Sequence, residues 1–186
     1  MPLPIVRPPE EVTDDLGCFI FMAIFAAFGV VVAFATDVIW LIVPVVAIAL
    51  ALAGYIVKQK VGIHAGVQHL RDEEQLGLVV YSDSQLWKSR IEEEWLPRFG
   101  SRVAVLNWSD RRNWDPTDSL VRLFYGAVEL NEDFNPAVIL LRTSRRPLLF
   151  RFYPAFKHAQ FGHPEELQRM ERQMFGMVEG VIRTIG

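Results

Sequence analysis

Residues 16–57 read LGCFIFMAIFAAFGVVVAFATDVIWLIVPVVAIALALAGYIV, and the only charged side chain among them is Asp37. No soluble domain needs an apolar run of this length, so the stretch predicts two membrane-spanning helices, at 16–35 and 38–57. At about 1.5 Å of rise per residue, each would extend about 30 Å, the thickness of the hydrocarbon core of a bilayer. Asp37 falls between the two, at a membrane surface, where a charge costs little. We therefore expect a transmembrane helical hairpin.

The hairpin is best interpreted as an anchor, because neither predicted span contains an ionisable side chain that would serve a proton or ion path. Pro44 lies within the second span, where membrane helices tolerate proline. Ala47 and Ala51, and likewise Ala49 and Ala53, place small residues four positions apart. Such spacing lets a neighbouring helix approach closely.

The segments flanking the hairpin predict its orientation. Residues 1–15 are rich in proline and acidic side chains and predict a disordered tail, and their acidity argues against a signal peptide. Lys58, Lys60 and Arg71 follow the second span, Arg7 precedes the first, and the turn has no basic residue. Because basic residues stay on the cytoplasmic side, we expect a two-span protein of the cell membrane with both termini in the cytoplasm.

Composition excludes several classes of function. The chain has 186 residues and a formal net charge of −3, which does not favour nucleic acid as a partner. Its single cysteine, Cys18, excludes an internal disulfide and a thiolate metal cluster. In the linker predicted at 58–75, His64 and His69 are five apart, which does not place them on one helix face as a metal pair requires. We expect no cofactor and no metal, and a solvated juxtamembrane helix or linker.

Residues 76–186 predict one α/β domain. Short apolar runs bounded by turn residues indicate strands, and apolar residues at helical spacing indicate helices. Pro97 and Gly100 are expected to end the first helix. The order is strand, helix, strand, helix, strand, strand, helix, which predicts a mixed four-stranded sheet flanked by helices. The strands are expected at 78–81, 103–106, 137–141 and 148–153, and the helices at 86–96, 118–128 and 163–185.

This order, the Asn135–Pro136 step before the third strand and the tight hairpin after it resemble the thioredoxin-like fold over 76–185. In that family the corresponding proline is cis and lies beside the active site. The chain departs from the family where the first strand meets its helix, because residues 82–89 read SDSQLWKS instead of containing Cys-x-x-Cys. A serine hydroxyl cannot replace a thiolate in disulfide exchange, so thiol–disulfide oxidoreductase activity is excluded.

Ser82, Asp83 and Ser84 follow the first strand, where open α/β sheets place their ligands. Together with Asn135 and Pro136 they form our candidate binding groove. These residue types are also the preferred helix caps, and capping is the favoured interpretation of the serine–aspartate run. No Gly-x-Ser-x-Gly elbow accompanies them, and we assign no catalytic residue.

A second candidate surface is the loop after the second strand, with Trp108, Arg111, Arg112 and Trp114. Exposed tryptophans indicate a binding surface, whereas buried ones would make the same loop part of the core. Basic residues form a third candidate surface, which would face anionic lipid headgroups or guard a solvated sheet edge. These are Lys58, Lys60, Arg142, Arg145, Arg146 and Arg151.

The sequence leaves three functions open. The favoured one is a membrane-anchored, non-redox binding or scaffolding module whose partner is another protein at the cytoplasmic face of the bilayer. The second is an enzyme acting on an anionic substrate held by Arg111, Arg112 or Arg142. The third is a structural subunit that packs into a membrane complex through the alanine faces of the hairpin.

Overall fold

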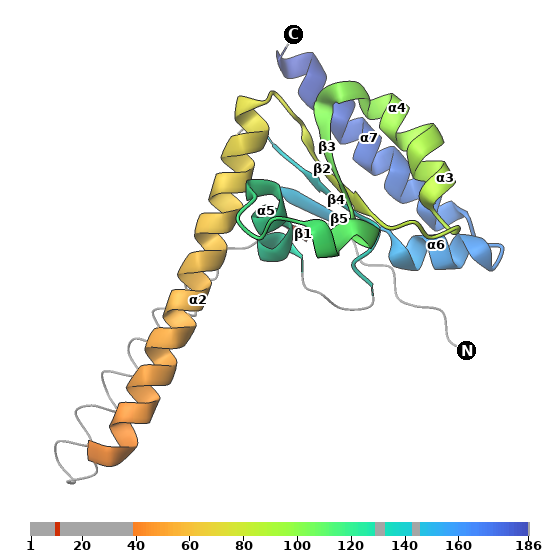
Figure 1. Cartoon of the computed structure of the whole chain (residues 1–186). Coiled ribbons are helices and arrows are strands. Elements are labelled where there is room, and N and C mark those ends of the chain that lie inside the picture. The colour runs from red at the N-terminus through yellow and green to blue at the C-terminus, as the bar shows by residue number, and fades with distance from the viewer. Residues whose placement is uncertain (1–9, 12–38, 129–132, 143–145, 186) are drawn as a thin grey trace. The chain divides into compact units, whose positions relative to one another are not determined.

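The structure is a computed structural model that describes residues 10–11, 39–128, 133–142 and 146–185 (Figure 1). The chain divides into two compact units, Thr13–Val61 and a head formed by Met1–Val12 with Gly62–Gly186. The first predicted span, 16–35, and the turn at Asp37 lie outside the described residues.

Helix α2 (Ile39–Asp72) begins where the second span was predicted and continues through the expected linker to Asp72. Its stretch Val43–Asp72 is long and apolar enough to cross a membrane. Large apolar side chains project into solvent along its first part, among them Val43, Ile48 and Leu50 at 63, 60 and 68% exposure. Such exposure is unfavourable in water, because burying one aliphatic side chain is worth about 1.5–3 kcal/mol.

The head contains the predicted mixed four-stranded sheet, extended by a two-residue strand. Strands β2 (Gly77–Tyr81) and β3 (Val103–Asn107) are parallel, and β2 pairs antiparallel with β4 (Ala137–Leu140). Strand β5 (Leu148–Arg151) pairs antiparallel with β4 and with β1 (Glu10–Glu11). The order across the sheet is β1-β5-β4-β2-β3. Of the tail predicted to be disordered, Glu10 and Glu11 are described, and they belong to this sheet.

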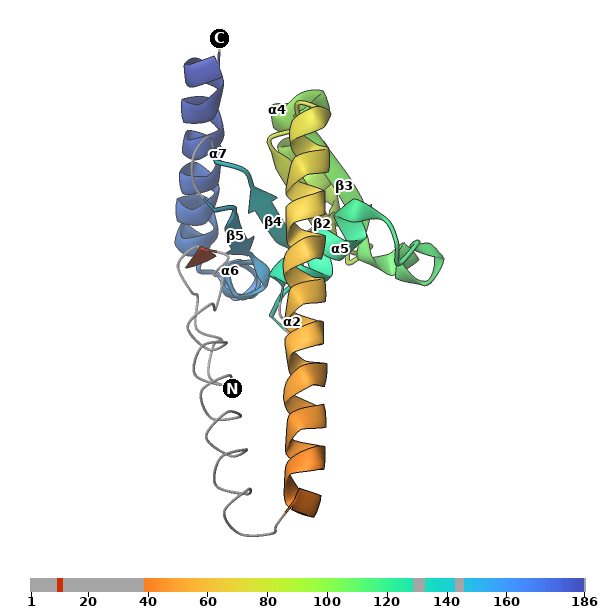
Figure 2. The same cartoon turned by 90° about the vertical axis from the view of Figure 1, so that its left-hand side faces the viewer.

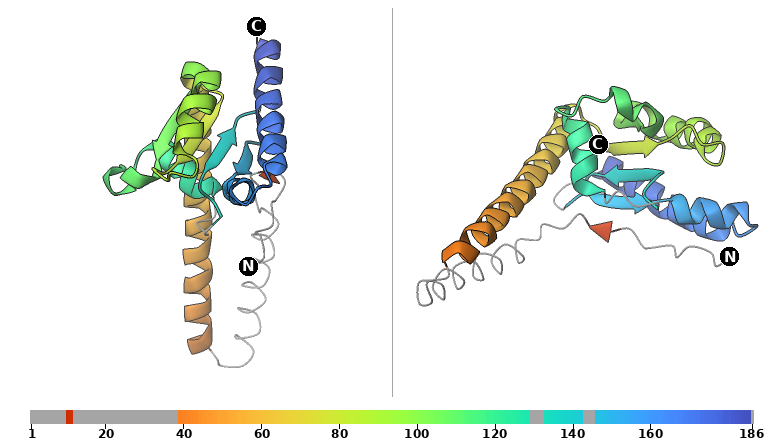
Figure 3. Two further views of the ribbon diagram at one scale, coloured as in Figure 1. Left: turned by 90° about the vertical axis from the view of Figure 1, so that its right-hand side faces the viewer. Right: turned by 60° about the horizontal axis from the view of Figure 1, so that its bottom comes forward.

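Helices cover both faces of the sheet, as Figures 1 and 3 show for α5 on one face and α3, α4 and α7 on the other. On the α7 face, Val79, Val138 and Phe150 lie in one buried cluster with aromatic residues of the helices. On the α5 face, Leu78 and Ile139 pack in a second cluster with the helix. Alternate residues of one strand enter opposite clusters because strand side chains alternate between faces.

The last turns of α2 belong to the head and pack closely on α5 (Ser119–Ala127), as Figure 2 shows. Gly62 and Gly66 permit this approach. A Cβ on Gly66 would overlap the Leu123 Cβ and lie 2.6 Å from the Ser119 carbonyl oxygen. Leu70 is completely buried one turn later. This part of the predicted linker is therefore a packed helix and is solvated on one side alone.

The helical segment after β2 runs through Pro97, which was expected to help to end it, and stops at Gly100, as expected. It comprises α3 (Lys88–Arg90), a π-helical turn η1 (Ile91–Trp95) and α4 (Leu96–Phe99). The Leu96 N–H donates to the Ile91 carbonyl five residues back. This wider turn accommodates Pro97, which has no N–H of its own. Gly100, at a φ of 64°, ends the segment, and the 3₁₀ turn η2 (Gly100–Arg102) leads into β3.

Helix α6 (Tyr153–Gln160) was not expected from the sequence, which predicted strand as far as residue 153. Pro154 in its first turn and Gly162, at a φ of 88° just beyond its end, are the signals that mark it. The final helix, α7 (Glu165–Ile185), confirms the predicted C-terminal helix. The 3₁₀ helix η3 (Trp108–Asn113) occupies the predicted loop after β3.

Candidate functional site

The carboxyl ends of β2 and β3 meet because the two strands are parallel, and polar side chains join them. The Asp83 carboxylate accepts hydrogen bonds from Lys88 Nζ at 2.6 Å and from Asn107 Nδ2 at 3.2 Å. The Asp83 N–H donates to Ser109 Oγ at 2.9 Å. The Lys88 ammonium, and then the Asn107 amide, hold the pKa of Asp83 below its usual value.

Ser82 and Ser84 organise the turn that enters α3. The Ser84 hydroxyl accepts from the Leu86 N–H at 3.3 Å, and its carbonyl accepts from the Lys88 N–H at 3.0 Å. The Ser82 carbonyl accepts from Trp87 Nε1 at 3.2 Å. These groups hold the turn together, but they do not cap α3, whose N-cap residue is Trp87 and has no side-chain cap hydrogen bond.

Asn135 and Pro136 lie at the same edge of the sheet as Ser82–Ser84, because Ala137 pairs with Val80. The Asn135–Pro136 peptide bond is cis. Pro136 is buried, and its carbonyl accepts from the Phe152 N–H at 2.9 Å. Asn135 Oδ1 is buried and accepts no hydrogen bond from the residues that the structure describes.

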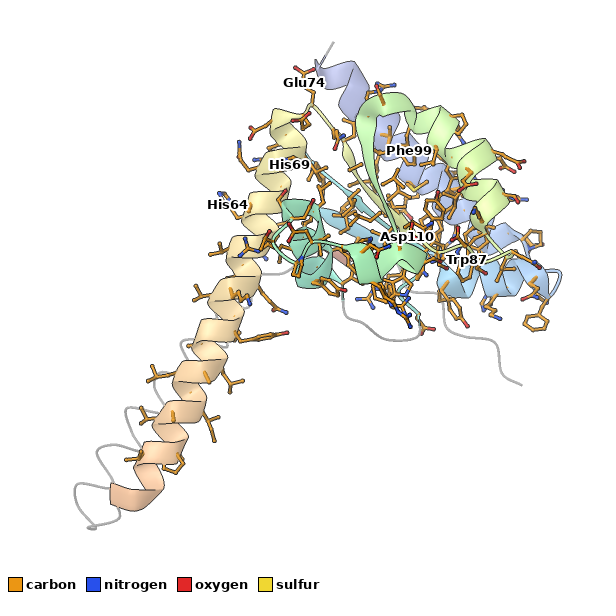
Figure 4. All side chains as sticks on the ribbon, viewed as in Figure 1. His64, His69, Glu74, Trp87, Phe99 and Asp110 are labelled. Carbon is orange, nitrogen blue, oxygen red and sulfur yellow. The ribbon has the colours of Figure 1, made fainter. Side chains whose placement is uncertain are left out.

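A hollow lined by Ser84 lies between the start of α3 and α6, and neither Asn135 nor Pro136 lines it. Two open pockets of about 420 and 400 Å³ adjoin there and share Gln85, Leu86 and Gln160. We call these two pockets the α3–α6 groove. Figure 4 shows Trp87 where the two helices meet. Sequence reasoning found the Ser84 side of this groove and missed the other side, because α6 was taken for strand and loop.

One end of the groove has a lysine beside aromatic rings. Ser84, Trp87, Tyr153 and Lys157 complete the first pocket. The Trp87 ring meets the Tyr153 ring edge-on, with centroids 6.1 Å apart, and Lys157 Nζ lies 5.7 Å from the Tyr153 ring centroid. Burial of Trp87 against these neighbours fixes the wall of this pocket.

The other end of the groove is acidic. Glu93 and Glu94 line it beside Arg90, above the apolar side chains of Phe156 and Leu167. Arg90 Nε and Nη2 donate to the Glu171 carboxylate at 2.7 and 2.9 Å, and Nη2 also lies 3.5 Å from Glu94 Oε2. The bond to Glu171 also raises the pKa of Arg90.

The loop with Trp108 and Trp114 packs largely onto the core. Both rings are half-buried, their centroids are 5.7 Å apart, and each contacts the ring of Phe124. Arg111 and Arg112 are exposed on η3, and the Arg111 guanidinium lies 4.9 Å from the Trp108 ring centroid. This arrangement agrees with the core interpretation of the tryptophans and leaves the two arginines at the surface.

The candidate lipid-facing residues differ in accessibility. Arg151 on β5 is 9% exposed, and this burial does not favour contact of its guanidinium with lipid headgroups. Lys58 and Arg146 are exposed. Lys60 and Arg142 are half-buried, and Arg145 lies outside the described residues.

Histidines and acids form no metal site in the part of the chain that the structure describes. His64 and His69 are exposed on α2 and lie at different positions along it (Figure 4). No protein-family model matches the chain, and no curated protein or solved structure matches it.

Proposed function

We propose that the chain is a membrane-anchored, non-redox binding module that captures another protein at the cytoplasmic face of the membrane. The observation that carries this proposal is helix α2, whose residues from Val43 to Val57 expose large apolar side chains and whose last turn supplies Leu70 to the core of the head. A stretch apolar on all sides requires lipid or a large apolar partner.

We further propose two spans and a cytoplasmic head. The predicted apolar span 16–35 supports the first, and Lys58 and Lys60, which follow the apolar stretch, support the second. A Cys18→Ser background allows a single cysteine to be placed at Arg102 in the head or at Thr13 in the tail. Both should react with a membrane-impermeant maleimide after permeabilisation and not in intact cells. Labelling of either site in intact cells would contradict this topology.

We also propose that the head is thioredoxin-like. The strand succession supports this, since the first two strands of the four-stranded sheet are parallel and the third lies antiparallel beside the first. Helices η1 and α7 pack on one face of the sheet, and α5 packs on the other. Because the head has no cysteine, such a domain cannot carry out thiol–disulfide exchange, but it keeps the surfaces with which it could bind a partner.

The α3–α6 groove is the proposed capture surface, because it is open to solvent and combines apolar side chains with amides that pair with a peptide backbone. A photo-crosslinking amino acid at Gln85 should give a discrete adduct in native membranes. Gln160→Trp, which fills the groove, should abolish that adduct, whereas Gln168→Trp on exposed α7 should not. If the adduct is unchanged by Gln160→Trp, the groove is not the capture surface.

A further inference from the structure

The α3–α6 groove has opposite charges at its two ends. The first pocket contains Lys157 and no acidic side chain. The second contains Glu93 and Glu94, and its one cation, Arg90, donates to Glu171 and lies 3.5 Å from Glu94 Oε2, so the carboxylates of Glu93, Glu94 and Glu171 outnumber the one cation. The groove is therefore positive near Tyr153 and negative near Ser89.

Between these ends the floor is apolar and the rim carries amides. Leu86 belongs to both pockets, Trp87 lies under the first, and Phe156 lies under the second. Gln85 and Gln160 are exposed and shared by both pockets, and each amide has donors and an acceptor for a peptide backbone. An apolar centre with a polar rim is the pattern of a protein-binding surface.

We infer that the α3–α6 groove binds a peptide segment of a partner that has an acidic end, an apolar middle and a basic end. The acidic end lies at Lys157 and the basic end at Glu93 and Glu94. This inference rests on the proposed function and names the chemistry of its partner. Glu93 and Glu94 would repel a phosphate backbone or an anionic lipid headgroup, and Lys157 would repel a peptide that is basic along its whole length.

Fluorescence anisotropy with the full-length chain in detergent tests this charge pattern. Three labelled peptides share a leucine–alanine core: one has aspartates at one end and lysines at the other, one has aspartates at both ends, and one has lysines at both. The wild type should bind the mixed peptide most tightly. Lys157→Glu should weaken that peptide about tenfold and transfer the preference to the lysine peptide, because both ends of the groove become negative.

The reciprocal variant and a matched control complete the test. Glu93→Lys with Glu94→Lys should transfer the preference to the aspartate peptide, and Glu93→Lys alone should give a smaller shift in the same direction if the double variant does not fold. Arg102→Glu reverses an exposed charge at the opposite end of β3 and should leave the order of the three peptides unchanged. Equal affinity for all three peptides in the wild type, or the same loss in Arg102→Glu, would overturn the inference.

Failure of the inferred charge pattern can be distinguished from failure of the proposed function. If the Gln85 crosslink depends on an open groove but none of the charge variants changes peptide preference, the module binds its partner by other chemistry and the charge pattern is overturned. If the crosslink is also insensitive to Gln160→Trp, both conclusions fail.

Discussion

The two parts of helix α2 differ in what surrounds their side chains. From Val43 to Val61 the helix exposes branched apolar side chains, and Leu50 is 68% exposed. From Gly62 to Asp72 it packs on the head with glycines and with Leu70, and Gly66 has no room for a side chain. A helix that is apolar all round suits lipid, whereas a helix with one buried stripe suits a folded core. The comparison shows that length and hydropathy alone do not distinguish these two environments.

The largest effect is expected where α2 contacts α5. Gly66→Leu should lower the free energy of unfolding of the head by about 4 kcal/mol, above the usual range for overpacking, because a backbone carbonyl blocks the new side chain. Thermal unfolding of the detergent-solubilised chain, followed by tryptophan fluorescence, measures this. Gly54→Leu is the matched control, since a Cβ there meets nothing within 4 Å. Equal destabilisation by both substitutions would remove the distinction between the two parts.

A charged substitution tests the exposed apolar part of α2. Ile48, which is 60% exposed, lies near the centre of the predicted second span. Ile48→Lys should cost about 3 kcal/mol of membrane insertion and leave the unfolding temperature of the head unchanged. The measurement is the fraction of protein retained in washed membranes. Full retention together with an unfolded head would show that Ile48 supports the fold and not the anchor.

A smaller effect is expected within the head, at the contact between η1 and α7. The Glu171 carboxylate accepts from Arg90 and, at 2.8 Å, from Trp95 Nε1, while its side chain is 11% exposed. Glu171→Gln should destabilise the head by about 2 kcal/mol, because it removes a charged acceptor from two donors. Glu165→Gln, exposed on the same helix, should have no effect in the same denaturation assay. Equal stability of Glu171→Gln and the wild-type chain would contradict a stabilising role for this contact.

The smallest effect concerns alkaline pH. Burial, and then the hydrogen bond to Glu92, raises the pKa of Tyr81 to about 12. The folded head thus holds this proton more tightly than the unfolded chain, so the stabilisation is complete below about pH 10 and is lost as the pH rises towards 12. Tyr81→Phe should reduce the fall in unfolding temperature across this range. Tyr125→Phe, at an exposed tyrosine, should not.

Much of the head follows from the sequence because its apolar runs are short and well punctuated. The runs at 78–81 and 137–141 predicted β2 and β4 to within one residue. Asp118 predicted the start of α5, where its carboxylate accepts from the Leu120 N–H at 2.7 Å. In these places local pattern and tertiary packing require the same conformation.

Only part of the candidate site could be predicted from the sequence. Ser84 lies on one wall of the α3–α6 groove, but the opposite wall is α6, whose eight residues are too few for a clear helical period. The sequence left a juxtamembrane helix or a linker open after the second span, and the packing of this segment on the head was missed although Ile63, Val67 and Leu70 recur at helical spacing. The accommodation of Pro97 depends on a π-turn, which no local residue pattern predicts.

Alkaline carbonate extraction of membranes from cells that produce the full chain distinguishes a chain anchored in lipid from one that is freely dissolved. The account predicts that the wild-type chain stays in the pellet and is released only by detergent, because α2 places its apolar part in lipid. Recovery of the wild-type chain in the supernatant, monodisperse without detergent, would contradict it.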